Sequence, residues 1–266
     1  MPPAISRTIV SVPGVLLDLL LILVAVAFCV ALHSLLQRRL RSEVLRRHND
    51  VAGYLFSAVS VLYAVVLGFT VVAVWQKYDG TVSNVESEVD AAADLYRVLD
   101  GYGARDRARI RMDLVRYADI VVTQEWPAMA AGEAISWAAL AELDDAADRI
   151  DAFAPRTLKE SAAQQAAIAD MQRLLDARRQ RVIHAVPAVP PVLWFALICG
   201  ALAMIAFCYI FGVENRPAQL LMTAILVSLI GILFVVIGAF SKPFAGSVRI
   251  SPEGWQYFQH RVHSVR

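Results

Sequence analysis

Four long apolar runs constrain this chain more than any other feature of its sequence. They cover residues 12–36, 53–75, 189–213 and 218–240, and the last three contain no Asp, Glu, Lys, Arg or His. A tilted helix needs about 20 residues to cross the hydrocarbon core of a bilayer. We therefore predict four transmembrane helices. The first run continues past Ala27 and is interrupted by Asp18, so we expect an uncleaved membrane helix rather than a signal peptide.

Composition excludes several other classes of protein. The chain is 58% hydrophobic and 18% charged, whereas soluble domains have about 45–50% apolar and about 25% charged residues. A net charge of +1 argues against a nucleic-acid partner. We expect an all-α integral membrane protein of the cell (inner or plasma) membrane, with lipids around its four helices. The three cysteines all lie in apolar runs and indicate packing residues, not a zinc site or a disulfide framework.

Charged residues outside the apolar runs bear on orientation. The loop 37–50 joins the first two helices and is rich in arginine, which places it in the cytoplasm by the positive-inside rule. The segment between helices two and three would then be external, and it is acidic, with 14 Lys and Arg against 19 Asp and Glu over residues 77–188. Four arginines before the third helix favour the opposite orientation, which stays open: Arg173, Arg178, Arg179 and Arg181.

The same segment is alanine-rich and predicts a helical-bundle insertion between helices two and three. We divide the chain into 1–75 (tail, helices one and two), 76–188 (extramembrane insertion), 189–240 (helices three and four) and 241–266 (tail). Breaks are expected at Gly101-Tyr102-Gly103, at Pro127 with Gly132, and at Pro155. The second membrane helix is expected to continue into the first insertion helix.

Apolar residues recur at helical spacing along all four insertion helices and predict their packing faces. In the second of these helices, Arg109 and Asp113 have the i,i+4 spacing of an ion pair. The predicted faces contain, helix by helix, Val82, Val85, Val89, Ala92, Tyr96 and Leu99; Ile110, Leu114, Tyr117 and Val121; Leu140, Leu143, Ala147 and Ile150; and Ile168, Met171, Leu175 and Val182.

Small and hydroxyl-bearing residues share one face of the second membrane helix. Ser57, Ser60, Ala64 and Gly68 are candidates for the wall of a pore. The alternative is that this face lets two helices approach closely. Similar faces occur in the third span (Ala196, Gly200, Ala203) and in the fourth (Ala224, Ser228, Gly231, Gly238).

Catalytic signatures are missing from the sequence. It has no glycine-rich phosphate loop, no His/Glu metal motif, no nucleophile elbow and no CxxC pair. We expect no enzyme activity, no cofactor and no metal site. The lack of ionisable residues in the last three spans also disfavours proton-coupled transport.

A set of short motifs resembles the bacterial bestrophin-like family known as DUF4239, a domain of unknown function. The matching pieces are HNDVAG at 48–53, VVLGF at 65–69, WQKY at 75–78, ESE at 86–88, YA at 117–118, EWP at 125–127, ARRQR at 177–181 and KPFAG at 242–246. The resemblance singles out Glu125, Trp126, Pro127, Arg178, Arg179, Arg181, Pro243, Phe244 and Gly246. We interpret Glu125-Trp126-Pro127 as a helix end in which Trp126 is buried and Glu125 pairs with an arginine.

The resemblance implies a homo-oligomeric ion channel, because bestrophins are pentameric channels with four membrane helices and a large helical region per subunit. Bestrophins keep that region cytoplasmic, contrary to the charge count above. They also bind calcium through acidic residues after the Pro-Phe motif. Here residues 247–254 offer Glu253 alone against Arg249, and Ca²⁺ takes 6–8 oxygens, so we expect no calcium clasp. The alternative function is a membrane-anchored interaction or sensory protein whose insertion binds a partner.

Overall fold

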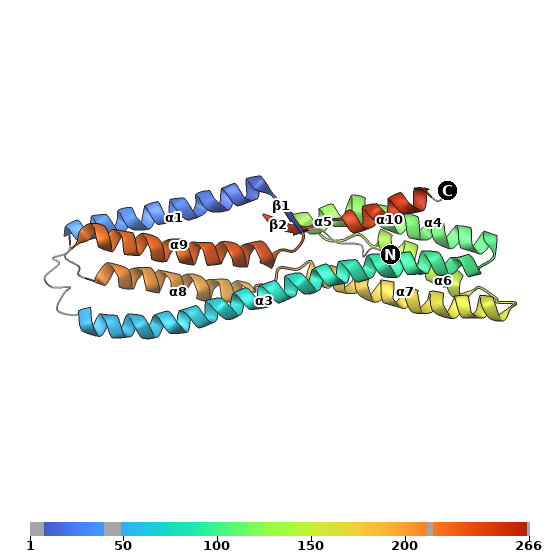
Figure 1. Ribbon diagram of the computed structural model, residues 1–266, viewed down its shortest axis with the longest axis horizontal. Coiled ribbons are helices and arrows are strands. Elements are labelled where there is room, and N and C mark those ends of the chain that lie inside the picture. The colour runs from blue at the N-terminus through green and yellow to red at the C-terminus, as the bar shows by residue number, and fades with distance from the viewer. Residues whose placement is uncertain (1–7, 40–48, 212–214, 265–266) are drawn as a thin grey trace. The chain divides into compact units, whose positions relative to one another are not determined.

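The structure, a computed structural model, describes residues 8–39, 49–211 and 215–264. Its contacts divide the chain into two compact units, which we describe one at a time (Figure 1). The membrane unit comprises residues 10–76 and 187–241. The insertion unit comprises residues 77–186 and 242–266, together with the segment that ends at Ile9.

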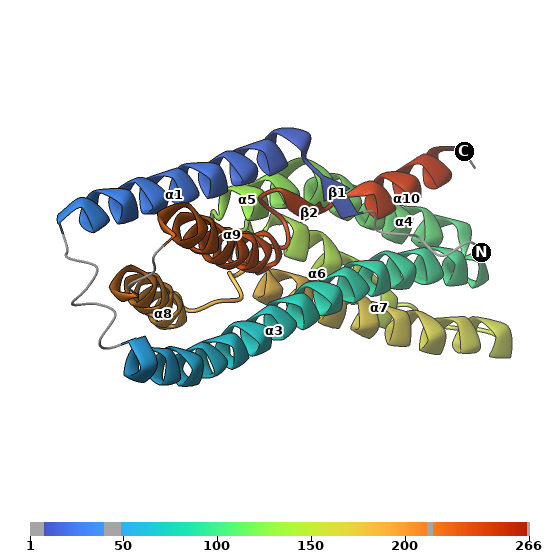
Figure 2. The ribbon, with the colours of Figure 1, turned by 60° about the vertical axis from the view of Figure 1, so that its left-hand side comes forward.

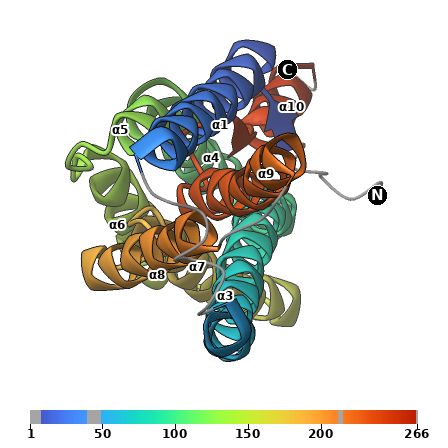
Figure 3. The ribbon, with the colours of Figure 1, turned by 90° about the vertical axis from the view of Figure 1, so that its left-hand side faces the viewer.

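Four helices supply the membrane unit: α1 (Val12–Arg39), the first part of α3 (Asn49–Val98), α8 (Pro191–Ile210) and α9 (Arg216–Ser241). Figure 3 shows them from one end. Each is long and apolar enough to cross a membrane, which confirms the four predicted spans. α3 continues without interruption to Val98, as expected from the absence of a strong helix breaker after the second apolar run.

The core of the membrane unit lies between α3, α8 and α9. Tyr63 and Leu67 of α3 are buried against Leu197 of α8, and the Tyr63 hydroxyl donates to the Leu197 carbonyl at 3.0 Å. Gly200 makes this contact possible. A Cβ at Gly200 would lie 2.4 Å from the Tyr63 ring, so only glycine fits there. Of the small-residue face predicted for the third span, Gly200 makes a close helix contact, whereas Ala196 and Ala203 are exposed.

The outer faces of these helices are apolar and uncovered within the chain. Phe28, Leu62, Phe195 and Met222 are each more than 60% exposed. Such a surface in water would drive aggregation, whereas lipid tails solvate it at no cost. The exposure pattern therefore supports insertion in a bilayer.

The insertion unit is a helical bundle completed by the C-terminal segment (Figure 2). Beyond the end of α3 it contains a 3₁₀ turn η1 (Leu99–Gly101), α4 (Ala104–Ile120), a π turn η2 (Val121–Glu125), α5 (Trp126–Ala131), α6 (Ala138–Asp151), α7 (Leu158–His184) and α10 (Glu253–Ser264). Thr157 and Glu160 form a capping box that fixes the start of α7.

The predicted packing faces of the first two insertion helices are mostly buried inside this unit, with Val82 and Tyr96 half-buried. Val85, Val89, Ala92 and Leu99 of the α3 and η1 segment are buried, and the four predicted residues of α4 and η2 are fully buried. Gly254 of α10 packs on Val89, where a Cβ would come within 3.3 Å of the valine side chain. The face that carries Val85 and Val89 therefore packs on elements of its own chain.

Three details of the bundle differ from the sequence predictions. In α6, Ala146 is buried and Ala147 is only half-buried. In α7, the buried face passes through Leu174, Arg178 and Arg181 instead of Leu175 and Val182, because both arginines are paired inside the bundle. Asp113 pairs with Arg149 of α6, Nε to Oδ2 at 2.8 Å, and not with Arg109.

Two short strands, β1 (Thr8–Val10) and β2 (Val248–Ile250), pair into a two-stranded sheet that the sequence did not predict. Three-residue strands are too short for an alternation pattern to be recognised.

Candidate functional site

A buried ion-pair network lies at the centre of the insertion unit. Arg181 of α7 donates from Nε to Glu88 Oε2 at 2.6 Å and from Nη2 to Glu88 Oε1 at 3.1 Å. The same Nη2 reaches Glu125 Oε2 at 2.6 Å. Arg178, one turn earlier on α7, donates to Glu125 Oε1 at 2.5 Å. The Tyr117 hydroxyl of α4 donates to Glu88. The network therefore joins α3, α4, η2 and α7.

The network is balanced in charge and buried. It holds two arginines and two glutamates, of which Arg181 and Glu88 are 0% exposed and Glu125 is 1% exposed. Burial disfavours the charged guanidinium, but the Glu88 and Glu125 carboxylates outweigh it and raise the pKa of Arg181 well above its usual range. Burial and the Glu88 carboxylate raise the pKa of Tyr117 well above 10. Arg181 is therefore charged and Tyr117 neutral across the physiological range.

The segment 242–250 packs onto this network through Trp126. The Trp126 ring meets the Phe244 ring edge to face at a centroid distance of 5.2 Å, and its Nε1 donates to the Ile250 carbonyl at 3.2 Å. The Arg181 guanidinium carbon lies 5.6 Å from the centre of the Trp126 ring. Pro243 accepts a hydrogen bond from the Ile250 amide at 2.8 Å. Gly246 has φ +90°, a conformation that explains glycine at this position.

Pro127 does not end a helix, contrary to the sequence interpretation. α4 passes through the π turn η2 directly into α5, and Pro127 occupies the first turn of α5. In the π turn the Trp126 amide bonds to the Val121 carbonyl five residues earlier. The wider turn accommodates the missing N–H of proline without stopping the chain. The helical segment ends at Gly132 instead, which has φ +72°.

The structure thus brings together most of the residues that the family resemblance singled out. Glu125, Trp126, Arg178, Arg181, Pro243 and Phe244 are linked by the contacts above. Arg179 is not part of the network, because it lies on the surface and pairs with Asp176 at 2.6 Å. The sequence analysis did not identify Glu88 or Tyr117 as site residues. The sequence signal for a role of this kind was that they fall in two of the matched motifs, ESE and YA.

The pore candidates of α3 divide between two faces of the helix. Ser57, Ala64 and Gly68 are exposed, and a Cβ at Gly68 would meet no atom within 4 Å. Ser60 faces α8: its hydroxyl donates to the Phe56 carbonyl at 2.6 Å and lies 3.7 Å from the Met204 sulfur. Three of the four candidates are therefore free to face an ion path, lipid or a neighbouring subunit.

A second polar cluster, which the sequence analysis did not predict, lies within the membrane unit. His33 of α1 is fully buried, and its Nδ1 lies 2.8 Å from the Thr223 hydroxyl of α9. Gln37 donates to Gln219 at 2.6 Å, and Tyr209 of α8 donates to the Cys29 carbonyl at 2.9 Å. These bonds tie α1 to α8 and α9, the use expected of polar side chains between membrane helices. Within the described ranges, no three His, Cys, Asp or Glu residues are grouped to hold a metal ion.

The geometry is that of a multi-pass helical membrane protein whose helical insertion is held together by a buried ion-pair network. Comparison with known proteins specifies the family: the sequence profile of the Bestrophin-like domain matches residues 23–255. The chain therefore belongs to the bestrophin-like family. No curated protein matches the sequence.

Solved structures share the fold. A bacterial bestrophin homolog from Klebsiella pneumoniae superposes at a TM-score of 0.61 and 14% identity, covering 90% of this chain and 97% of its own. Two variants of that homolog give TM-scores of 0.64 and 0.63 at 14% identity, covering 90% and 91% of this chain and 98% and 97% of their own.

Proposed function

We propose that this chain is one subunit of a homo-oligomeric ion channel whose ion path follows the outward face of α3. The observation that carries the proposal is the face formed by Ser57, Ala64 and Gly68, which is small, weakly polar and uncovered within the subunit. Family membership supports the same function. One helix cannot enclose a path, so the proposal requires several copies of α3 around a symmetry axis.

The character of this face favours passive conduction. Residues 53–75 contain no Asp, Glu, Lys, Arg or His that could bind and release a proton at physiological pH. Hydroxyls and small residues can line a narrow aqueous path, and apolar residues can close it by excluding water. The bulkier side chains Tyr63 and Leu67 are turned inward to the core. We therefore propose that the protein conducts ions and catalyses no reaction.

Several finer assignments belong to the same proposal. The chain is a member of the bacterial DUF4239 group in the cell membrane, with lipids against its outer faces, and its parts are 1–75, 76–188, 189–240 and 241–266. The insertion is external, and no calcium clasp follows the Pro-Phe motif.

Thiol labelling tests the external placement of the insertion. With Asp144, which is exposed, replaced by cysteine, the chain should react with an impermeant thiol reagent in intact cells, with the unmodified chain as control. Labelling only after lysis would show that the insertion is cytoplasmic.

Two measurements on the purified full chain test the proposal. Mass photometry in detergent gives the number of subunits, and ion flux from liposomes gives conduction. We expect a closed oligomer and a flux that scales with the protein-to-lipid ratio. A monomer, or an oligomer whose liposomes leak no faster than protein-free ones, refutes the channel and favours the alternative of a membrane-anchored interaction protein.

A further inference from the structure

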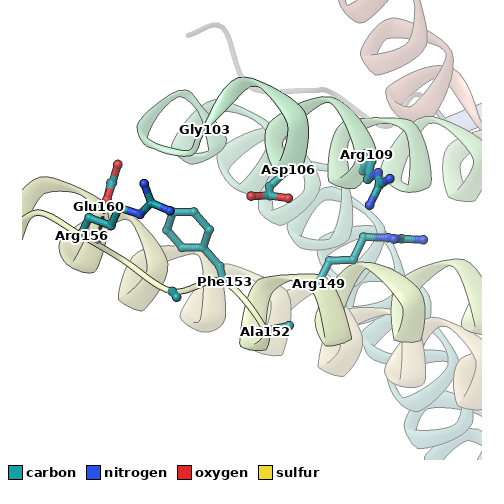
Figure 4. A pocket seen from close by; sticks show the side chains of 9 residues that line it. Gly103, Asp106, Arg109, Arg149, Ala152, Phe153, Arg156 and Glu160 are labelled. Carbon is teal, nitrogen blue, oxygen red and sulfur yellow. Dashed lines mark hydrogen bonds between the residues drawn. The ribbon is translucent and has the colours of Figure 1, made fainter.

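A cavity of about 570 Å³ opens in the insertion unit between α4, α6 and the turn that joins α6 to α7 (Figure 4). Its wall carries Arg109 of α4, Arg149 of α6, and Arg156 of the turn. Asp106 and Glu160 are the two acidic residues of the wall. Figure 4 shows Arg109 and Arg149 projecting from facing helices at one end, with Arg156 and Glu160 at the other.

Two of the three arginines on the wall of this cavity have no ion-pair partner among the residues that the structure describes. Asp113, the expected partner of Arg109, is bound to Arg149. Arg109 and the Arg156 side chain form no ion pair with any residue that the structure describes. Glu160 is held at the start of α7, because its Oε2 accepts from the backbone amides of Arg156 and Thr157 at 2.6 and 3.2 Å. Asp106 and Glu160 are the two carboxylates of the wall that oppose its arginines.

The size and lining of the cavity indicate the kind of molecule that fits. Sites for small molecules have volumes of about 300–1,000 Å³. Phe153 forms the apolar part of the wall, and its ring packs on Tyr102 at a centroid distance of 4.2 Å. Gly103, Ala152 and Ala154 add little apolar surface beside Phe153, so the wall offers few contacts to an acyl chain. A soluble molecule with a charged group at each end therefore fits better than a lipid.

We propose that this cavity binds a soluble small molecule carrying two or more phosphate groups. Guanidinium groups bind phosphate through charge-assisted, often bidentate, hydrogen bonds. Three guanidiniums that approach from different elements suit the tetrahedral oxygens of phosphate better than a planar carboxylate. Phosphates at the Arg109 and Arg149 end and at the Arg156 end would use both ends of the cavity. The proposal does not depend on ion conduction.

Isothermal titration calorimetry of the full chain in detergent, with sodium pyrophosphate as the probe, tests this site. We expect one site per chain, with affinity that falls as salt rises. Arg109→Ala and Arg156→Ala should each weaken binding by about tenfold or more. Asp106→Asn should tighten binding by about threefold or more, because it removes an opposing charge. A purely structural role of these residues would not produce changes of opposite sign.

The matched control is Arg116→Ala, which removes one positive charge from the same helix outside the cavity. It should change the affinity by no more than about twofold. Equal loss in the control, or no saturable heat in the unmodified chain, overturns the proposal. Citrate that binds as tightly as pyrophosphate overturns the choice of phosphate. Tighter binding of a water-soluble short-chain phosphatidic acid assigns the site to a lipid headgroup and overturns the choice of a soluble ligand.

Discussion

Arg181 of α7 and Glu88 of α3 are 93 residues apart in the sequence and form a two-point ion pair from which water is excluded. The pair is anchored on both sides. Tyr117 donates to Glu88, and Glu125 accepts a further bond from Arg181. An unpaired charge at this depth would be strongly unfavourable, so the network is stable only when all four helical segments that supply it are in place. The network therefore specifies how α3, α4, η2 and α7 pack.

Replacing Arg181 with methionine should destabilise the protein severely. The change keeps the apolar stem but leaves Glu88 without its main partner, at a cost of about 3–5 kcal/mol of unfolding free energy. Thermal melting followed by circular dichroism measures the loss. Arg179→Met is the matched control, because Arg179 lies two residues away and pairs with Asp176 on the surface. Similar losses in both variants would contradict the central role of the network.

Two glycines of the membrane unit should respond oppositely to an added methyl group. Gly200→Ala places a Cβ about 2.4 Å from the Tyr63 ring, and overpacking of this kind costs about 1–3 kcal/mol. Gly68→Ala meets no atom within 4 Å and should leave the melting temperature of the detergent-solubilised protein unchanged or slightly higher. If Gly68→Ala dissociates the oligomer, that position is a packed interface and not a pore wall.

A carboxylate at Gly68 separates a pore from a dry surface. In a water-filled path the charge of Gly68→Asp stays solvated, so the channel should assemble and its selectivity should shift toward cations. Against lipid or a packed helix the same charge costs about 2.5–3.5 kcal/mol. Reversal potentials in planar bilayers and mass photometry give the two readouts. Loss of assembly, or assembly with unchanged selectivity, would exclude Gly68 from the ion path.

Acidification should weaken the insertion unit through His184. Burial, followed by the nearby Lys77 charge, lowers the pKa of His184 below its ordinary value of 6.5, and its Nδ1 lies 3.1 Å from Asn84 Nδ2. The unfolded chain therefore binds the proton more readily, so this contribution to stability is present above pH 6.5 and is lost as the pH falls below it.

His184→Gln tests this assignment. Melting temperatures between pH 7.5 and 5.5 should depend less on pH in this variant than in the unmodified chain. His260→Gln, on the exposed side of α10, should keep the original slope. Equal slopes in all three proteins would show that another group is responsible.

The spans were predictable because their signal is local. Absence of charge over more than 20 residues is decisive on its own, and the continuity of α3 followed from the absence of a helix breaker. The buried face of α7 was not predictable in the same way. Arg178 and Arg181 are buried because Glu88 and Glu125 approach from other helices, and periodicity within α7 carries no information about those partners.

Two further misses have the same physical origin. Arg109 and Asp113 have ideal spacing for a pair within α4, yet Arg149 of α6 supplies the partner of Asp113. Pro127 was assigned to a helix end from its missing N–H, but the π turn absorbs that defect. In both cases a local rule was overridden by geometry that only the folded bundle provides.

The closed ion-pair network also limits how this sequence can diverge. Its four charges sum to zero and all are buried, so a mutation at Glu88, Glu125, Arg178 or Arg181 alone leaves a buried charge without compensation. Replacement of the quartet must proceed by paired changes, through intermediates that are poorly folded. The outer faces of the membrane helices have no such restriction, since one apolar residue there can replace another singly. Amino-acid substitution is therefore expected to be fast on the lipid-facing sides of the membrane helices and very slow at these four positions.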